Sequence, residues 1–230
     1  TVWNVTPEGE VSFTTDQYSS KHDDDGSLQG RFVLLASGAM ERPFPIKGWT
    51  LPGAMGAGAA QILLKGSGAL PSGPVVLAGC GPLLYLLAWQ YLRSGIKPTA
   101  LVDTTSFSDY FKSFPYFLPA LSARKDLIKG IKLLASIRSG GIPMYTGVKD
   151  LQIEGDQSVE ALSFSHRGRQ KKLPTSLGVL HQGVVSNTQL SMSTGVEHDW
   201  NEQQLCWQPV TDQWGHVPDT SIYVAGDSRA

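Results

Sequence analysis

The sequence is poor in cysteine and has no long apolar run. Its 230 residues include two cysteines, Cys80 and Cys206, which stand far apart and in no Cys-x-x-Cys arrangement. This usage argues against a disulfide framework, a zinc site and a dithiol redox centre, and it favours a reducing, cytoplasmic setting. The apolar stretches, such as residues 83–89, end well short of the roughly 20 residues of a membrane-spanning helix. We therefore expect no transmembrane segment.

A strong charge of either sign is also missing. The formal net charge is −1, and 17% of the residues are charged. Proteins that bind polyanions electrostatically carry a basic excess, so we expect neither nucleic acid nor an anionic membrane as a partner. One basic cluster remains at a turn, for which a solvated hairpin and a phosphate contact are both open interpretations: Arg167, Arg169, Lys171 and Lys172.

The ends of the sequence lack the usual marks of a complete chain. It begins with Thr1 rather than methionine, and it stops on "YVAGDSRA", where an expected strand runs directly into a Gly-Asp turn. Domains rarely stop at such a point, so we expect this chain to be a piece of a longer polypeptide. The opening "TVWNVTPEGE" predicts a strand and a turn rather than a signal peptide.

Hydrophobic patterning, with a hydrophobic content of 41%, predicts a globular α/β fold. Residues 74–103 show a β-α-β pattern, with strands at 74–78 and 99–103 and a helix at 82–93. Alternating runs over residues 142–187 predict a β-meander. We expect a Rossmann-like three-layer domain in which a parallel sheet carries the β-meander as a second layer.

Two further helical regions are expected. One covers residues 54–65, where small side chains allow close approach to another backbone. The other, residues 107–139, is broken by prolines in its first half. Its second half carries apolar residues at helical spacing, which we expect to face a core: Leu127, Ile128, Ile131, Leu134 and Ala135.

The stretch "VVLAGCGPLL", residues 75–84, has features of a nucleotide-binding loop. In a dinucleotide fold the first glycine permits the turn after the strand, and the second lets the backbone approach the pyrophosphate at the amino end of the helix. Gly79 and Gly81 fill these roles, and Pro82 suits the first helical turn. Leu84 stands where a third glycine is usual, so a unit that packs like this fold but has lost its nucleotide is the alternative.

Two other residues belong to this candidate site. Asp103 ends the next expected strand, where a carboxylate accepts hydrogen bonds from both ribose hydroxyls and repels a 2′-phosphate. Cys80 lies within the loop itself. It is either a small residue that fits the turn or a reactive thiol at a helix amino end. No pair of histidines has the spacing of metal ligands.

Two segments resemble the flavoproteins that carry two dinucleotide-binding domains. In "FVLLASGAMERPFPIKGWTLPG" a buried strand ends in Ser37 and Gly38, at the position of their Ala-Thr-Gly motif, where the chain crosses from an FAD domain into an inserted NAD-type domain. The stretch "TSIYVAGDSRA" is similar to their late FAD motif. The resemblance implies that Gly226 and Asp227 meet the flavin nucleotide near its ribityl-pyrophosphate portion.

A more specific resemblance is to the A (alpha) subunits of the opine oxidase, hydrogen cyanide synthase and heteromeric sarcosine or proline dehydrogenase group. It rests on "ERPFPIKGWTLPGAM", "VVLAGCGPLL", "VLHQGVVSNTQL" and "LCWQPVTDQWG". Gly-x-Gly-Pro-Leu-Leu is common in that family, which makes Leu84 a family trait. The resemblance implies partial FAD-domain segments at residues 1–45 and 205–230, with an inserted NAD(P)-type domain at 46–204.

The resemblance also implies a function. The chain would belong to the alpha subunit of a flavin-dependent amine or opine dehydrogenase, a hetero-oligomer whose flavin-containing catalytic subunit takes a hydride from the carbon beside the substrate nitrogen. The alpha subunit would supply an electron outlet and a second dinucleotide site, for NAD or another adenine nucleotide. FAD would be bound by the whole protein, because the GxGxxG of the FAD domain is absent from this sequence. No residue here is a candidate for the amine chemistry itself.

Two other functions remain open. One is a non-catalytic docking or assembly domain with a degenerate nucleotide site. The other is an NADH-dependent flavoprotein reductase, which Leu84 and the missing FAD fingerprint make less favourable.

The strand end at "VLHQGVVSN" lines the nucleotide cleft in the family. His181 is therefore either a site contact or a structural histidine, and Gly183, in the same loop as Asn187, is the expected position of close approach. Three tryptophans near Cys206 form either a packing patch between domains or a surface that faces a flavin or a partner: Trp200, Trp207 and Trp214.

Overall fold

A computed structural model of the chain describes residues 1–15, 25–106, 108, 112 and 124–229. The chain forms two compact units, one made of Thr1–Met40 with Val184–Ala230 and the other of Glu41–Gly183. The family resemblance implied FAD-domain segments at residues 1–45 and 205–230. In the structure, residues 184–204 belong to the same compact unit as these segments, because they pair and pack with its strands.

The unit Glu41–Gly183 is built on a parallel sheet. Its strands are ordered β6-β13-β7-β8-β9, and the four neighbouring pairs of this sheet all run parallel. The bounds of the strands are Ala54–Gly56 (β6), Val75–Cys80 (β7), Ala100–Asp103 (β8), Met144–Thr146 (β9) and Leu177–Gln182 (β13). β7 lies in the middle and is buried on both faces, as its continuous apolar sequence predicts.

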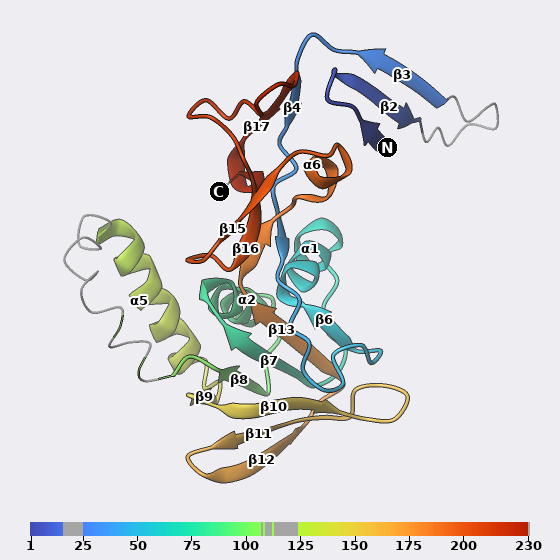
Figure 1. Ribbon diagram of the computed structural model, residues 1–230. Helices are drawn as coiled ribbons and strands as arrows, with labels where there is room; N and C mark the ends of the chain where they lie inside the picture. The colour runs from blue at the N-terminus through green and yellow to red at the C-terminus, as the bar shows by residue number, and fades with distance from the viewer. Residues whose placement is uncertain (16–24, 107, 109–111, 113–123, 230) are drawn as a thin grey trace. The chain divides into compact units, whose positions relative to one another are not determined.

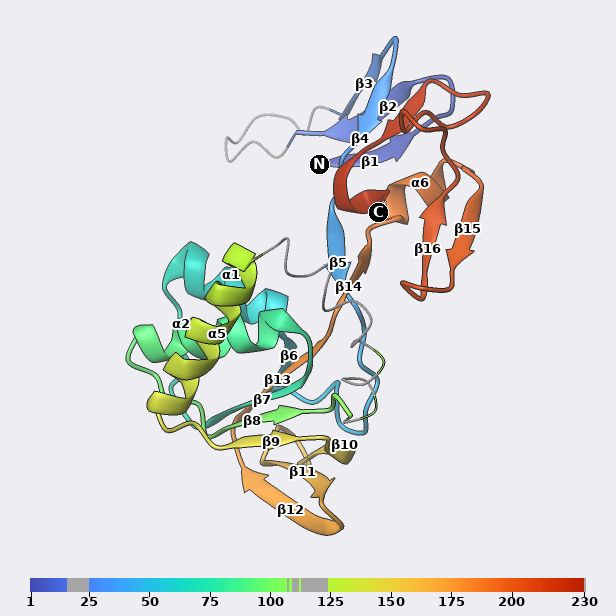
Figure 2. The same cartoon turned by 90° about the vertical axis from the view of Figure 1, so that its left-hand side faces the viewer.

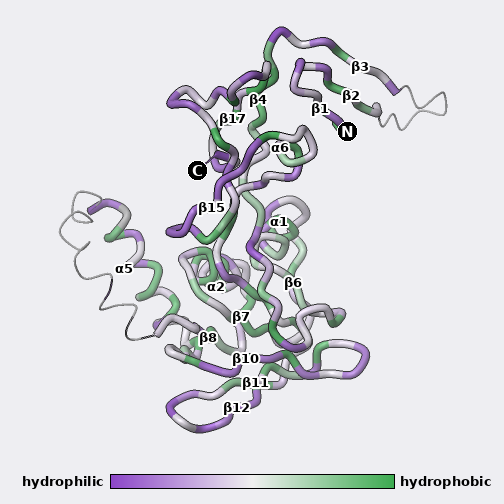
Figure 3. The backbone as a smooth tube through the Cα atoms, viewed as in Figure 1, coloured by the Kyte–Doolittle hydropathy of each residue, from purple (hydrophilic) through white to green (hydrophobic). Residues whose placement is uncertain are grey.

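An antiparallel β-meander forms a second layer of this unit. It consists of β10 (Lys149–Glu154), β11 (Ala161–His166) and β12 (Arg169–Pro174). A hydrophobic cluster that includes Val76, Val102 and Phe164 joins it to the parallel sheet. The outer strand β12 is largely hydrophilic (Figure 3), in agreement with its mostly exposed residues. The basic cluster found in the sequence lies on β12 and on the turn before it.

Helices form the third layer, on the other face of the parallel sheet (Figures 1 and 2). They are α1 (Ala57–Ser67), α2 (Pro82–Arg93) and α5 (Arg124–Ser139). The bounds of α2 are those expected from the sequence: Pro82 opens it, and Gly95 follows its end with a φ of +83°. The predicted three-layer α/β architecture is therefore confirmed.

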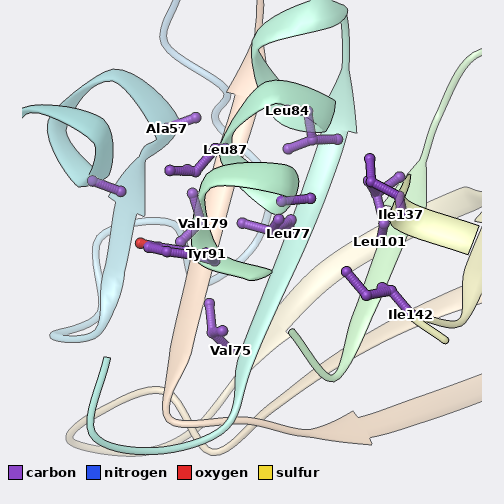
Figure 4. Close-up of a cluster of buried hydrophobic side chains, with 12 residues drawn as sticks. Ala57, Val75, Leu77, Leu84, Leu87, Tyr91, Leu101, Ile137, Ile142 and Val179 are labelled. Atoms are coloured by element: carbon purple, nitrogen blue, oxygen red, sulfur yellow. The ribbon is translucent and has the colours of Figure 1, made fainter. Parts of the chain in front are cut away.

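Leu84 is part of the core between α2 and the sheet. The buried residues of α2 recur at helical spacing: Leu84, Leu87, Ala88 and Tyr91. Figure 4 shows Leu84, Leu87 and Tyr91 against residues of the sheet. Leu84 itself is 0% exposed. The side chain at the third glycine position thus fills a packed core and does not point out of the loop.

Two helical predictions need correction. Residues 54–56 form strand β6, and the helix begins at Ala57 rather than Ala54. The expected core-facing stripe of α5 is also wrong in part, because Leu127, Ile128 and Ile131 are exposed.

Only the carboxyl-terminal half of α5 reaches the core. There Ile137 is fully buried and Leu133 packs beside it. The apolar spacing predicted the helix correctly, but it could not show which turns of the helix pack against the rest of the unit. Much of the first half of the expected helical region 107–139 lies outside the described residues.

The first unit contains short sheets around a core of its own. β1, β2 and β3 pair antiparallel, β4 pairs parallel with β17, β5 pairs with β14, and β15 and β16 form a hairpin. Val5, Leu35 and Ile222 are among its buried residues. The elements are bounded as follows: Val2–Val5 (β1), Glu10–Thr14 (β2), Asp25–Gln29 (β3), Val33–Leu35 (β4), Ala39–Glu41 (β5), Val184–Ser186 (β14), Gln189–Ser193 (α6), His198–Asn201 (β15), Cys206–Pro209 (β16), Ile222–Val224 (β17) and Gly226–Ser228 (η3).

The tryptophans near Cys206 lie on or near the β15–β16 hairpin. The rings of Trp200 and Trp207 meet edge to face, with their centroids 5.5 Å apart. Both side chains are about half exposed, and Trp214 is 78% exposed. Cys206 is buried and does not form a disulfide with Cys80. Among the described residues, no helix is long and apolar enough to cross a membrane.

The burial of Leu84 leads to a stability prediction. Leu84→Ala removes a fully buried side chain, so we expect the free energy of unfolding in urea to fall by about 2–5 kcal/mol. Ile62→Ala on α1 is the matched control, because Ile62 is 72% exposed, and it should change stability by about 0.5 kcal/mol or less. Equal effects of the two substitutions would contradict the placement of Leu84 in the core.

A second prediction concerns Asp212 in the first unit. The backbone N–H groups of His216 and Trp214 donate to its Oδ1 at 2.9 and 2.8 Å and hold the pKa of this carboxyl below its usual value. A carboxyl with a lowered folded-state pKa stabilises the fold above its unfolded pKa of about 4, and this contribution disappears as the pH falls further.

Asp212→Asn should therefore be less stable than the wild type at pH 7, and the difference should shrink below about pH 4. Thermal unfolding across the pH range measures this. Asp199→Asn, at an exposed carboxyl of β15, serves as the control. A stability difference for Asp212→Asn that stays constant from pH 7 to pH 3 would contradict the prediction.

Candidate functional site

The glycine loop lies between the carboxyl end of β7 and the amino end of α2. Gly79 has a φ of +131° and Gly81 a φ of +97°, which favour glycine at both positions. A Cβ atom on Gly79 would overlap the carbonyl oxygen of His181 on the neighbouring strand β13. Gly79 is therefore required by the close approach of two strands. Cys80 is the last residue of β7, and Pro82 is exposed at the first turn of α2.

Gly81 has a different environment. A Cβ atom built on it would meet only the edge of the His181 ring, with Cδ2 and Nε2 both at 3.4 Å. Gly81 is thus less crowded than Gly79, and its neighbouring side chain is an imidazole. The loop therefore combines a glycine of positive φ with a helix amino end, where N–H groups lack intrahelical partners.

Asp103 lies beside the loop, as the strand pattern predicted. It is paired with Gly79 in the β7–β8 register and is 1% exposed. Its Oδ1 accepts a hydrogen bond from the backbone N–H of Thr105 at 2.7 Å, and its Oδ2 accepts one from the hydroxyl of Tyr85. A ribose hydroxyl would have to share these oxygens, each of which has two lone pairs.

Glu41 is a site residue that the sequence reasoning missed. The backbone N–H groups of Ala57 and Gly58 donate to its carboxylate at 3.0 and 2.6 Å, at the amino end of α1. The N-cap residue of this helix, Gly56, offers no side-chain acceptor. Glu41 thus supplies from a distant strand the negative charge that favours a helix amino end.

The small residues at the start of α1 make room for Glu41. A Cβ atom on Gly56 would overlap its carboxylate, and one on Gly58 would lie 2.9 Å from Oε2. The run "GAMGAGAA" suggested close approach to another backbone, whereas the approaching group is a carboxylate. That run was the one sequence signal that pointed to this contact.

His181 connects Glu41 to the glycine loop. Its Nδ1 lies 2.6 Å from Oε1 of Glu41, and the ring is 3% exposed. A carboxylate only accepts hydrogen bonds, so we assign the proton of this contact to Nδ1. The pair fixes the orientation of the ring, with its Cδ2–Nε2 edge toward Gly81.

Gly183 follows β13 and has a φ of +90°. A Cβ atom there would have nothing within 4 Å, so it is the backbone conformation that favours glycine at this position. Its carbonyl oxygen accepts a hydrogen bond from the backbone N–H of Arg42 at 2.9 Å. The structure thus ties the segment after Glu41 to the end of β13.

A second group of predicted site residues comes together in the first unit. Because β4 and β17 are parallel, the turns after them lie at the same end, and the N–H of Ala225 donates to the carbonyl of Leu35 at 3.0 Å. Gly226 and Asp227 follow, both exposed, in the short helix η3.

Ser37 and Gly38 follow the other strand of this pair and are held by Asn187. The Ser37 hydroxyl donates to the carbonyl of Asn187 at 2.8 Å, and the Asn187 N–H donates to the carbonyl of Gly38 at 3.0 Å. Ser37, Gly38, Gly226 and Asp227 therefore lie at one end of the β4–β17 pair. In the described residues, no group of three or more His, Cys, Asp or Glu side chains is arranged to hold a metal ion.

Comparison with solved structures defines the class of fold. The chain matches an FAD-dependent pyridine nucleotide-disulphide oxidoreductase from Desulfovibrio vulgaris with a TM-score of 0.62 and 18% identity, over 99% of this chain and 52% of that one. No family model matches the sequence. The fold is therefore that of the FAD- and NAD(P)-dependent oxidoreductases.

Sequence comparison shows more specific relatives of the chain. It is 45% identical to the alpha (A) subunit of opine oxidase from Agrobacterium tumefaciens (strain Ach5), over 85% of this chain and 38% of that protein. It is 25% identical to the HcnB subunit of hydrogen cyanide synthase from Pseudomonas aeruginosa, over 97% of this chain and 48% of that protein. The chain is thus a relative of these subunits, which confirms the resemblance found in the motifs, and it spans less than half the length of either.

Substitutions of Gly79 and Gly183 test the close contact between β7 and β13. Gly79→Ala forces a methyl group into the His181 carbonyl oxygen, so we expect it to destabilise the unit by more than about 3 kcal/mol. Gly183→Ala meets no atom and should cost about 1–2 kcal/mol through its positive φ alone. Urea unfolding of both variants measures the difference, and equal losses would contradict the described strand contact.

Proposed function

We propose that the unit Glu41–Gly183 binds an adenine dinucleotide such as NAD, with its pyrophosphate at Gly79–Pro82. The observation that carries this proposal is the loop itself. The loop follows the central strand of a parallel sheet, has no side chain and a positive φ at Gly81, and leads into a 12-residue helix whose amino end favours an anion. Asp103, at the end of the next strand, is the proposed contact to the ribose.

We further propose that the first unit contributes to an FAD site. The parallel pairing of β4 and β17 brings together Ser37, Gly38, Gly226 and Asp227, and this arrangement supports the assignment. Their backbone groups would lie near the ribityl-pyrophosphate portion, where the Asp227 carboxylate would accept hydrogen bonds from hydroxyl groups of the ribityl chain. Bound FAD supplies a two-electron acceptor for hydride transfer.

In the whole protein, we propose, these sites serve a flavin-dependent amine or opine dehydrogenase. The relatives are named as subunits, so they belong to multi-subunit enzymes. A flavin-containing partner subunit would take the hydride from the carbon beside the substrate nitrogen. This chain would supply the second dinucleotide site and the route by which electrons leave, and we expect the complex in the cytoplasm.

A docking or assembly role is the second candidate function. It is favoured by Asp103, whose two oxygens are already bonded to Tyr85 and Thr105 and whose side chain is buried. In that case the loop would be kept for packing alone, and the unit would present a surface to the partner subunit without binding a nucleotide.

Calorimetric titration separates the two functions. We expect the protein to bind NAD more tightly than NADP, because Asp103 repels a 2′-phosphate. Asp103→Asn should weaken NAD binding about tenfold, since it removes a charge-assisted hydrogen bond. Asp156→Asn, at an exposed carboxyl of the β10–β11 turn, should bind like the wild type.

If neither NAD, NADP, ADP nor ATP binds at millimolar concentration, the docking role is the better assignment. If NAD binds and Asp103→Asn binds it equally well, Asp103 does not contact the ribose. Circular dichroism of each variant shows whether the fold is retained.

A further inference from the structure

His181 has one ring nitrogen engaged and one directed at the loop. Nδ1 is bonded to Glu41, and among the described residues Nε2 has no hydrogen-bond partner. Nε2 lies 3.4 Å from the position that a Cβ atom of Gly81 would take, although the ring is only 3% exposed. The ring nitrogen that Glu41 does not hold thus lies beside Gly81, at the amino end of α2.

The contact with Glu41 determines what Nε2 offers. Because Nδ1 carries the proton that is donated to the carboxylate, Nε2 of a neutral imidazole has a lone pair and repels the oxygen of an anion. When the ring is protonated, Nε2 becomes a second donor, and Glu41 balances the positive charge. Only the imidazolium form therefore binds a phosphate oxygen at this position.

We propose that His181 is a proton-linked phosphate ligand of the nucleotide site, with Glu41 as its positioning residue. The inference rests on the proposed binding of a nucleotide at Gly79–Pro82. As the phosphate arrives, His181 takes up one proton from solvent and donates Nε2–H to a phosphate oxygen. No bond is made or broken apart from this proton transfer.

The charges around the ring are consistent with this role. Glu41 faces it from β5 and shares its own negative charge with the N–H groups of Ala57 and Gly58 at the amino end of α1. The amino end of α2 adds partial positive charge on the side of Gly81. On the neighbouring strands, Cys80 lies one register position from His181, and Asp103 is separated from it by Gly79.

Proton uptake is measured by titrating the protein with NAD and with ADP in buffers of different ionisation enthalpy. We expect close to one proton to be taken up per nucleotide at a pH where His181 is neutral in the unliganded protein. The affinity should then rise by up to about tenfold for each unit of decreasing pH within the range of about pH 8 to 6, where histidine changes its charge.

Two substitutions assign the proton to this pair. His181→Gln should remove the uptake and weaken nucleotide binding about tenfold, because a charge-assisted hydrogen bond is lost. Glu41→Gln keeps the imidazole but removes its counter-charge, so the uptake should shift to lower pH. The control is His166→Gln on β11, where the ring packs on Tyr145 in the same unit, and it should leave affinity and uptake unchanged.

Each outcome decides the inference. If the wild type binds NAD without proton uptake, or if His181→Gln keeps the full affinity and uptake, the inference is wrong while the proposed nucleotide site stands. If the wild type binds neither NAD nor ADP, the site and the inference fail together. Should His181→Gln fail to fold, Glu41→Gln decides, and an unchanged pH profile of nucleotide binding overturns the role of the pair.

Discussion

The contact between β7 and β13 at Gly79 determines the geometry of the candidate site. The carbonyl oxygen of His181 occupies the space that a side chain at residue 79 would need. These strands are far apart in the sequence but adjacent in the sheet. Their close approach places the imidazole of His181 against Gly81 and, through Nδ1, brings Glu41 to the same point. A larger residue at position 79 would separate the loop from both side chains.

The amino ends of α1 and α2 lie at this edge of the sheet and differ in what surrounds them. Both α1 and α2 present unpartnered N–H groups at their amino ends. At α1 the protein satisfies them itself, with the Glu41 carboxylate between Gly56 and Gly58. At α2 the first residue is proline, and the residue before it is Gly81, beside the His181 ring. One helix end is therefore bonded to an internal carboxylate, and the other is the end at which we propose that an external anion binds.

The central β7–α2–β8 segment was predictable from the sequence because its signals are local. The apolar run, Pro82 and Gly95 each act within a few residues of the boundary that they mark. Glu41 was not predictable in this way, since its partners are 16 and 140 residues away in the chain. The prediction that the apolar stripe of α5 faces a core was wrong in part for a related reason. Helical spacing shows which residues share a face, but only the packing of the chain decides whether a face is covered.

The third position of the glycine motif turns out to say little about whether a nucleotide binds. Leu84 faces the core, away from the loop, so its size is a matter of helix packing. The groups that bear on binding are the charged and polar ones at the sheet edge. Asp103 is bonded to protein groups, while His181 has one nitrogen held and one directed at Gly81. If a nucleotide binds as proposed, the acceptance of its phosphate would depend on the protonation of that ring, because the carboxylate of Glu41 lies 2.6 Å from Nδ1 and would balance an imidazolium charge.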